Sequence, residues 1–354
     1  MCRWFAYLSD SEPCLLEDVL IVPQHSLSKQ VHDRYLPYLS HFEPDSTKKL
    51  TRAEIGSRNS PYNMDGLGVG WYSTARAEYG ECDGPHAALY KVLRQPMSDP
   101  IYQSICANTA TTAVFAHIRA ASGDTAITEY NCHPFQFGRW LFMHNGSVAH
   151  FSEIRRDVLT AISDQALKLV KGTTDSEHLA ALFFTYLEQS RGDAAWSTSQ
   201  PLEDVKAAME QTIMKVLSIQ RNVIGRTGGE VAASSLNCAV TDGTQLFATR
   251  FRNHSTEHPP SLYFSTRAGP TLNRKYPGHP DKAVDGTEDV NKEGSGHGAH
   301  IIVASEPITY RAEDWELIEK NTCLMSPSLG GKSQARAFRV HLVRCVYLTH
   351  MKRA

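Results

Sequence analysis

The chain opens with Met1-Cys2-Arg3-Trp4-Phe5-Ala6-Tyr7-Leu8, a short apolar run that predicts the first strand of a buried sheet. Removal of the initiator methionine, which is expected before a small residue, would leave Cys2 as residue one. An N-terminal cysteine carries both a thiol and an α-amine, and an α-amine pKa of about 7.7–8.0 suits a general base near neutral pH. A buried strand cysteine is the simpler interpretation of position alone, so Cys2 is a candidate nucleophile that other residues must support.

The composition argues against a nucleic-acid or membrane-binding protein. The 354 residues contain 36 Lys+Arg and 38 Asp+Glu, for a net charge of -2. No apolar run is long enough to span a membrane, and the opening stretch is too short for a signal peptide. Eight irregularly spaced cysteines without a C-x-x-C pair favour a reduced, cytoplasmic compartment. His297 and His300 lack the ligand spacing of a zinc site, so we expect no metal and no cofactor.

Charge is distributed unevenly along the chain. Residues 321–354 contain six basic residues and no acidic residue, so they carry +6, whereas residues 1–320 carry -8. No linker of distinct composition divides the first 310 residues. We therefore expect one domain over residues 1–320 and a divergent basic tail over residues 321–354. A nucleic-acid-binding arm is the less favoured interpretation of that tail.

Strand and helix patterns alternate in a way that predicts layered α+β or α/β packing. Apolar residues at three- and four-residue steps predict a helix over 151–170. A second helix is expected from Thr174-Asp175-Ser176-Glu177, a capping-box pattern, and a third after Pro201. Polar segments at 41–60 and 277–298 are expected loops. Strands are expected at 2–8, 113–118, 140–144, 236–241, 245–251, 261–266 and 300–304, with Asp242-Gly243 as a hairpin turn.

Four clusters of polar residues in the first half of the chain could carry chemistry. Each also has an ordinary structural interpretation: a salt bridge for Arg119, a turn for Asn145-Gly146, and helix-dipole pairing for Asp175. The histidines in these clusters are more simply explained as core residues. Three glycines, Gly66, Gly68 and Gly70, are not spaced as a phosphate loop, and we expect them to allow close backbone approach beneath a site. The clusters are residues 116–122, 131–135, 142–146 and 172–177.

Taken together and in order, these clusters and the opening stretch resemble the glutamine-hydrolysing domain of class II (N-terminal nucleophile) amidotransferases. The matching motifs are Met1-Cys2-Arg3, His117-x-Arg119-x-x-Ser122, Asn131-x-His133-Pro134, His144-Asn145-Gly146 and Thr174-Asp175-Ser176-Glu177. The motifs span residues 2–180, and the segments 236–243 and 302–307 extend the resemblance to about residue 320. It implies an α+β fold, the four-layer αββα sandwich of N-terminal nucleophile hydrolases.

The resemblance implies that Cys2 is the nucleophile and that its own α-amine is the base. The side-chain amide of Asn145 and the backbone N–H of Gly146 would form the oxyanion hole. Two preorganised donors of this kind are worth a few kcal/mol each where negative charge develops.

The resemblance also implies how a γ-glutamyl group is held. Arg119 would bind its α-carboxylate and Asp175 its α-ammonium, because a zwitterion needs one cation and one anion. Ser122 and His133 belong with them as substrate-binding residues. These residues recognise only the glutamyl end of the substrate, so the leaving amine stays open.

Within the family, the pattern is most similar to the fungal amidotransferase-like subunit that cleaves glutathione to glutamate and Cys-Gly with a metallopeptidase-like partner. One alternative is a glutamine amidotransferase or glutaminase subunit, and another is the hydrolase of γ-glutamyl cysteine sulfoxides in ergothioneine synthesis. A catalytically silent scaffold is an alternative of a different class, and the intact set of motifs around Cys2 argues against it.

Overall fold

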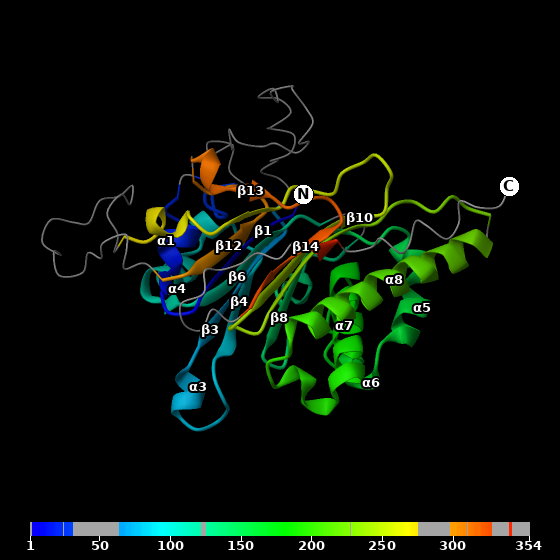
Figure 1. The fold of residues 1–354 in the computed structure, drawn as a ribbon, viewed down its shortest axis with the longest axis horizontal. Helices are drawn as coiled ribbons and strands as arrows, with labels where there is room; N and C mark the ends of the chain where they lie inside the picture. The colour runs from blue at the N-terminus through cyan, green and yellow to red at the C-terminus, as the bar shows by residue number, and fades with distance from the viewer. Residues whose placement is uncertain are drawn as a thin grey trace, which may run out of the picture.

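Two sheets lie face to face at the centre of the molecule (Figure 1). The computed structural model describes residues 2–23, 25–30, 64–121, 125–226, 228–274, 298–309, 311–327 and 340–341. Within these ranges one sheet has the strand order β13-β11-β12-β1-β6-β3-β4 and the other β15-β14-β10-β9-β8-β7.

The strands of the first sheet are β1 (Arg3–Ser9), β3 (Gly66–Ser73), β4 (His86–Val92), β6 (Ala113–Arg119), β11 (Tyr263–Ser265), β12 (His300–Ala304) and β13 (Glu316–Leu317). Those of the second are β7 (Phe135–Phe137), β8 (Trp140–Ser147), β9 (Ser235–Thr241), β10 (Leu246–Arg252), β14 (Thr322–Ser326) and β15 (Val340–His341).

Strand β1 shows how the sequence builds the layers, because all of its residues are buried. Its side chains alternate in direction, as they must in a strand. Trp4, Ala6 and Leu8 pack into the core between the two sheets, whereas Phe5 and Tyr7 face the opposite core. A strand with two apolar faces therefore requires a packed layer on each side of its sheet.

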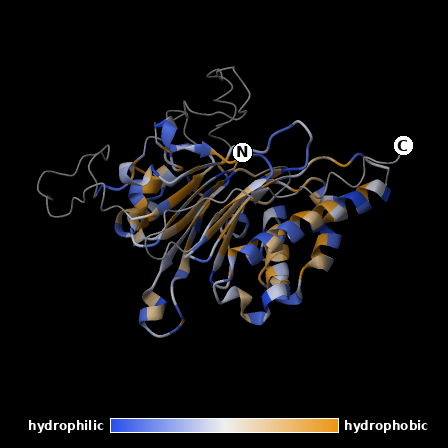
Figure 2. Ribbon diagram, in the orientation of Figure 1, coloured by the Kyte–Doolittle hydropathy of each residue, from blue (hydrophilic) through white to orange (hydrophobic). Residues whose placement is uncertain are grey.

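Helices supply the two outer layers (Figure 1). The second sheet is covered by a helical layer whose apolar faces join its core. The first sheet packs on two shorter helices around a separate core. The covering helices are α5 (Phe151–Ala161), α6 (Asp164–Leu167), α7 (Asp175–Arg191) and α8 (Leu202–Arg226) on one side, and α1 (Leu16–Leu20) and α4 (Pro100–Asn108) on the other. The expected four-layer αββα sandwich is confirmed, and Figure 2 shows its hydrophobic residues concentrated in the strands and on the inner helix faces.

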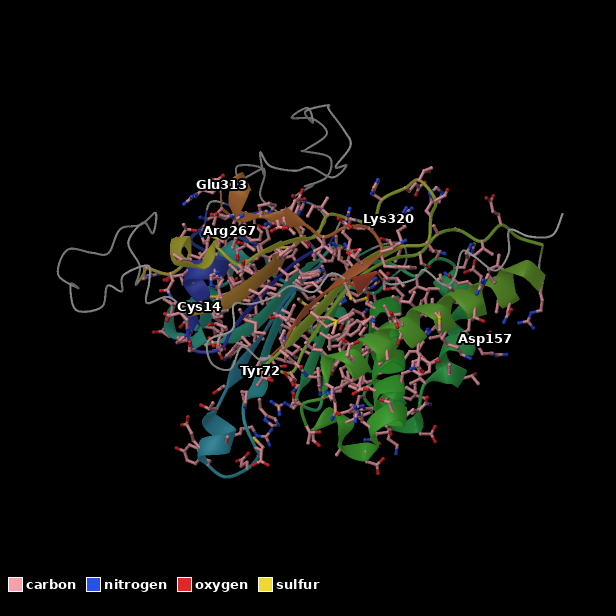
Figure 3. All side chains as sticks on the ribbon, viewed as in Figure 1. Cys14, Tyr72, Asp157, Arg267, Glu313 and Lys320 are labelled. Atoms are coloured by element: carbon pink, nitrogen blue, oxygen red, sulfur yellow. The ribbon has the colours of Figure 1, made fainter. Side chains whose placement is uncertain are left out.

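Tyr72, labelled in Figure 3, joins the two sheets near one end. Its hydroxyl lies 2.8 Å from the carbonyl oxygen of Arg139 and 2.9 Å from that of Thr241. Gly243 packs on its ring, where an added Cβ would lie 2.3 Å from Cδ1, and has a φ of +89°. The predicted hairpin turn at Asp242-Gly243 is thus confirmed, and glycine is required there by both conformation and space.

The helix predictions are confirmed at α7 and α8 and wrong at one point. The helix expected over 151–170 breaks into α5 and α6, because Ser163 caps a new helix by accepting a hydrogen bond from the N–H of Ala166. Thr174 caps α7 through the N–H of Glu177. The carboxylate of Glu177, however, accepts from the N–H groups of Lys171 and Gly172 rather than closing the capping box.

Strand β14 lies just beyond the domain boundary expected at residue 320. It pairs with β10 along its whole length, and all its residues are buried. Residues 328–339 and 342–354 of the expected tail, the expected loop 41–60 and residues 277–297 lie outside the described residues. Among the described residues, no helix is both long and apolar enough to cross a membrane.

Candidate active site

The thiol of Cys2 lies at the end of the first sheet, against the backbone of Ala120. Strand β1 runs antiparallel to β6 with Arg3 opposite Ile118, so residue 2 falls beside the residues that follow β6. The Sγ lies 3.2 Å from the Ala120 nitrogen and 3.4 Å from its carbonyl oxygen. Asp65 holds this turn by accepting a hydrogen bond of 2.6 Å from the N–H of Ala121. The thiol therefore has a fixed backbone donor that stabilises a thiolate and an acceptor for S–H.

The environment of Cys2 favours the protonated thiol. Desolvation by burial raises the pKa of this thiol above its ordinary value. The hydrogen bond from the Ala120 N–H and the positive charge of Arg119 lower the pKa, but their effect is smaller. The thiol is therefore not ionised in advance near neutral pH, and a nucleophilic role requires a base that takes its proton.

Cys2 opens on a cavity of about 470 Å³. The sequence-predicted residues Arg119, His133, Gly146 and Asp175 also line it. Asn145 is buried directly before Gly146 in β8 and, in the described residues, does not line the cavity. Ser122 lies outside the described residues. Among those residues, no group of three or more His, Cys, Asp or Glu side chains is arranged to hold a metal ion.

Arg119 is the last residue of β6, and only 3% of it is exposed. Its Nη1 donates a hydrogen bond of 3.1 Å to the carbonyl oxygen of Ala126. No carboxylate within the described ranges forms an ion pair with it. A buried guanidinium without an opposite charge is costly, so the cavity beside it favours a bound anion.

Asp175 begins α7, and two backbone groups fix its carboxylate. Oδ2 accepts a hydrogen bond of 2.8 Å from the N–H of Val148, and Oδ1 accepts one of 2.7 Å from the N–H of Ser176. Residue 148 directly follows β8, so this carboxylate ties the start of α7 to the end of the strand that carries Gly146. The cavity thus holds a fixed anion as well as a fixed cation.

The three histidines of the motifs differ in their surroundings. His144 is a satisfied core residue, as expected, because it bonds to the Ser176 hydroxyl and the Ser235 carbonyl. His117 bonds to the carbonyl of His144 and stacks on His133 with 4.0 Å between ring centroids. His133 lines the cavity, and its ring nitrogens are buried with no hydrogen-bond partner among the described residues. Burial lowers the pKa of His133 well below its ordinary value, so the ring is neutral.

The expected close approach beneath the site is confirmed at the glycines of β3. A Cβ added to Gly68 would lie 1.7 Å from the His133 carbonyl oxygen, and one on Gly66 would lie 2.3 Å from the Sγ of Cys132. The glycines therefore let the segment carrying His133 cross directly over β3. Residues 66–73 themselves form strand β3, which the sequence pattern does not predict.

Asn131 connects two loops that border the cavity. It is fully buried, its Nδ2 donates to the Ala126 carbonyl at 2.7 Å, and its Oδ1 accepts from the Thr173 N–H at 2.8 Å. Arg119 donates to the same Ala126 carbonyl. Asn131 thus positions two loops: the one containing Ala126, whose carbonyl accepts from Arg119, and the one that precedes Asp175.

Helix α5 contributes to the cavity wall, although its sequence gives no indication of this. Phe151, Ser152 and Arg155, from its first two turns, line the cavity together with Cys2. In the sequence these residues belong to an ordinary amphipathic helix with a charged outer face. No local signal distinguishes Arg155 from the adjacent Arg156.

The sequence profile of class II glutamine amidotransferases matches residues 47–336. The chain belongs to this family. The match begins after Cys2 and does not include that residue. A yeast protein named probable glutamine amidotransferase DUG3 (Saccharomyces cerevisiae) is 29% identical over 330 residues, which are 92% of this chain and 81% of the yeast protein.

Solved structures of other proteins show the same fold. A glutamine aminotransferase class-II domain protein from Silicibacter pomeroyi superposes with a TM-score of 0.55 at 21% identity, covering 96% of this chain and 99% of the other. The allosteric regulatory enzyme of purine biosynthesis superposes with a TM-score of 0.50 at 11% identity, covering 97% of this chain and 49% of the other.

Proposed function

We propose that this protein hydrolyses γ-glutamyl amide bonds with Cys2 as the nucleophile. The observation that carries the proposal is the position of the Cys2 thiol in one cavity with a buried cation, Arg119, and a fixed anion, Asp175. The cation would bind the α-carboxylate of a γ-glutamyl group and the anion its α-ammonium. Together they would place the γ-carbonyl carbon against the thiol.

The oxyanion would be stabilised at the end of β8. Gly146 lines the cavity. Its backbone packs closely against β9, since an added Cβ would lie 1.8 Å from the Ser235 carbonyl oxygen. A fixed backbone N–H is the kind of donor an oxyanion hole needs, and the Asn145 amide would supply the second. Ser122 and His133 complete the proposed substrate site.

The proposed reaction begins with removal of Met1, which frees the α-amine of Cys2. The amine takes the thiol proton as the sulfur bonds to the γ-carbonyl carbon. The tetrahedral intermediate collapses, the C–N bond breaks, and the leaving amine departs with that proton. Water then adds to the thioester carbon and gives a proton to the α-amine. The C–S bond breaks, glutamate leaves, and the thiolate regains the proton, so one water is consumed for each amide.

We propose glutathione as the substrate, cleaved to glutamate and Cys-Gly in the cytoplasm with a separate metallopeptidase-like subunit. This would make the protein an omega peptidase of glutathione catabolism. The motif resemblance described above and the 29% identity to the yeast protein support this assignment. The cavity of about 470 Å³ also falls within the range of roughly 300–1,000 Å³ typical of ligand pockets. We further propose that the amidotransferase-type domain, expected over residues 1–320, extends through β14 to residue 327, and that the appended basic tail begins after it.

A substrate panel tests the proposal. Glutamate release should be compared for glutathione, glutamine and a γ-glutamyl cysteine sulfoxide, with and without candidate partner subunits. We expect turnover of glutathione, its loss in Cys2→Ala and its retention in Cys82→Ala, a half-buried cysteine that does not line the cavity. Release that persists in Cys2→Ala would show that another group is the nucleophile.

A further inference from the structure

Part of the cavity wall has no function in holding a γ-glutamyl group. That part comes from α5, where Phe151 and Arg155 stand one turn apart on the same helix face and both line the cavity with Cys2. Arg155 is exposed at this wall, unlike the buried Arg119. The cavity therefore carries a second cation beyond the pair that would bind the glutamyl zwitterion.

A buried histidine orients this second cation. The Nδ1 of His178 lies 2.7 Å from the Thr174 carbonyl, which can only accept, so Nδ1 carries the proton and Nε2 is an acceptor. The Nε–H of Arg155 donates to that Nε2 at 3.4 Å. His178 is 1% exposed, and its ring packs edge-on against Phe151 with 5.2 Å between centroids. The contact uses Nε of Arg155 and leaves the two Nη groups for a ligand.

The nearby acidic side chains are engaged elsewhere. Asp175 accepts from the backbone of Val148 and Ser176, and Glu153 lies 3.6 Å from the ring of His150. No carboxylate in the described part of the chain forms an ion pair with Arg155. Its guanidinium is therefore held in a fixed orientation at the cavity wall. A guanidinium in this position can bind a carboxylate through two parallel hydrogen bonds.

We propose that Arg155 binds a free carboxylate on the leaving amine, so that the substrates are γ-glutamyl peptides or γ-glutamyl amino acids rather than glutamine. This inference rests on the proposed function, because it assigns the other end of the same substrate. Glutamine releases ammonia, which has no carboxylate for Arg155. A dipeptide leaving group such as Cys-Gly carries one. Binding energy at that remote carboxylate would help to hold the γ-carbonyl at Cys2.

Glutathione and its C-terminal glycinamide form the test pair, because they differ only in the carboxylate that Arg155 would bind. We expect kcat/KM to favour glutathione by roughly tenfold or more in the wild-type protein, and Arg155→Gln to bring the ratio close to one. Arg156→Gln is the matched control, because Arg156 is exposed on the same helix but does not line the cavity. It should leave the ratio unchanged. An unchanged ratio in Arg155→Gln would overturn the inference, as would an equal loss of activity on both substrates.

A binding measurement separates this inference from the proposed function. Cys2→Ala protein and the double variant Cys2→Ala/Arg155→Gln can be titrated calorimetrically with glutathione and with its glycinamide. Tighter binding of glutathione that disappears in the double variant supports the role of Arg155, even if the wild-type protein releases no glutamate. Equal affinities, or no binding of either compound, would contradict that role whatever the activity.

Discussion

The Sγ of Cys2 lies 3.2 Å from the backbone nitrogen of Ala120, the first residue beyond β6. This contact follows from the antiparallel register of β1 and β6, so two neighbouring strands of the first sheet place the candidate nucleophile beside the end of β6. The same strand β6 ends in Arg119, which places a cation and a thiol at one end of the sheet. Two motifs more than a hundred residues apart in the sequence thereby line one cavity.

The carboxylate of Asp175 can be tested with little risk to the fold. In Asp175→Asn the side-chain oxygen can still accept from the Val148 N–H, but the charge that would bind a substrate ammonium is lost. We expect kcat/KM for glutamate release to fall roughly tenfold to hundredfold, as for the loss of a charged hydrogen bond. Asp157→Asn, at the exposed position on α5 labelled in Figure 3, should have no effect. Equal activity in the two variants would remove Asp175 from the substrate site.

Gly68 should be far less tolerant of substitution than its place in a strand suggests. Gly68→Ala would place a Cβ 1.7 Å from the His133 carbonyl oxygen, so the segment over β3 must move. We expect a loss of about 3 kcal/mol in the free energy of unfolding, measured by denaturant titration. Gly225→Ala, near the end of α8 with nothing within 4 Å of the added Cβ, should be neutral or slightly stabilising. A mild effect of Gly68→Ala would mean that this close approach is not rigid.

The buried histidines predict a loss of stability in acid. Desolvation lowers the pKa of His117 to about 3, although its hydrogen bond to the His144 carbonyl opposes that shift. The unfolded chain takes up a proton at this residue near pH 6.5, whereas the folded chain does not until about pH 3. This residue therefore does not change the free energy of unfolding above pH 6.5. As the pH is lowered from 6.5 to about 3, it decreases that free energy by about 1.4 kcal/mol per pH unit. Denaturant titrations at pH 7, 6, 5 and 4 should show a shallower slope for His117→Gln than for the wild type, and identical slopes would refute the prediction.

Strand β14 sets how far the chain can be shortened. Cys323, Leu324 and Met325 are buried in the second sheet, beside β10. A chain ending after Asn321 loses these side chains and should unfold at markedly lower denaturant concentration, since each buried apolar residue contributes a few kcal/mol. A chain ending after Pro327 should keep both its stability and its catalytic rate. Loss of catalysis in the longer version would assign a function to the basic tail.

Much of the fold follows from local sequence. Apolar runs locate β1, β6, β8 and β9, and Thr174 marks the start of α7, because strand period and helix capping are local properties. Strand β3 is different, since glycines are poor strand formers and are used here only because another segment crosses them. The sequence does not predict that the helix is interrupted at Ser163, because apolar residues continue the helical period through this position.

The residues of the candidate site also fall into two groups, those that the sequence predicts and those that only the structure shows. The sequence predicts Cys2, Arg119 and Asp175 as candidate site residues because each lies in a motif, and motif order is visible in a sequence. It does not predict Arg155, because the position of that residue in the cavity depends on how α5 packs against α7 and on a contact with His178. An exposed arginine on an amphipathic helix is ordinary until that packing is known.

Mass spectrometry of the acid-quenched protein during turnover of a γ-glutamyl substrate tests the central claim most directly. The account predicts that the N-terminal peptide begins at Cys2, without Met1, and carries one γ-glutamyl group in thioester linkage at that cysteine. It also predicts that this adduct disappears as the substrate is exhausted. Retention of Met1 in the active protein, or a γ-glutamyl group on any other residue, would contradict it.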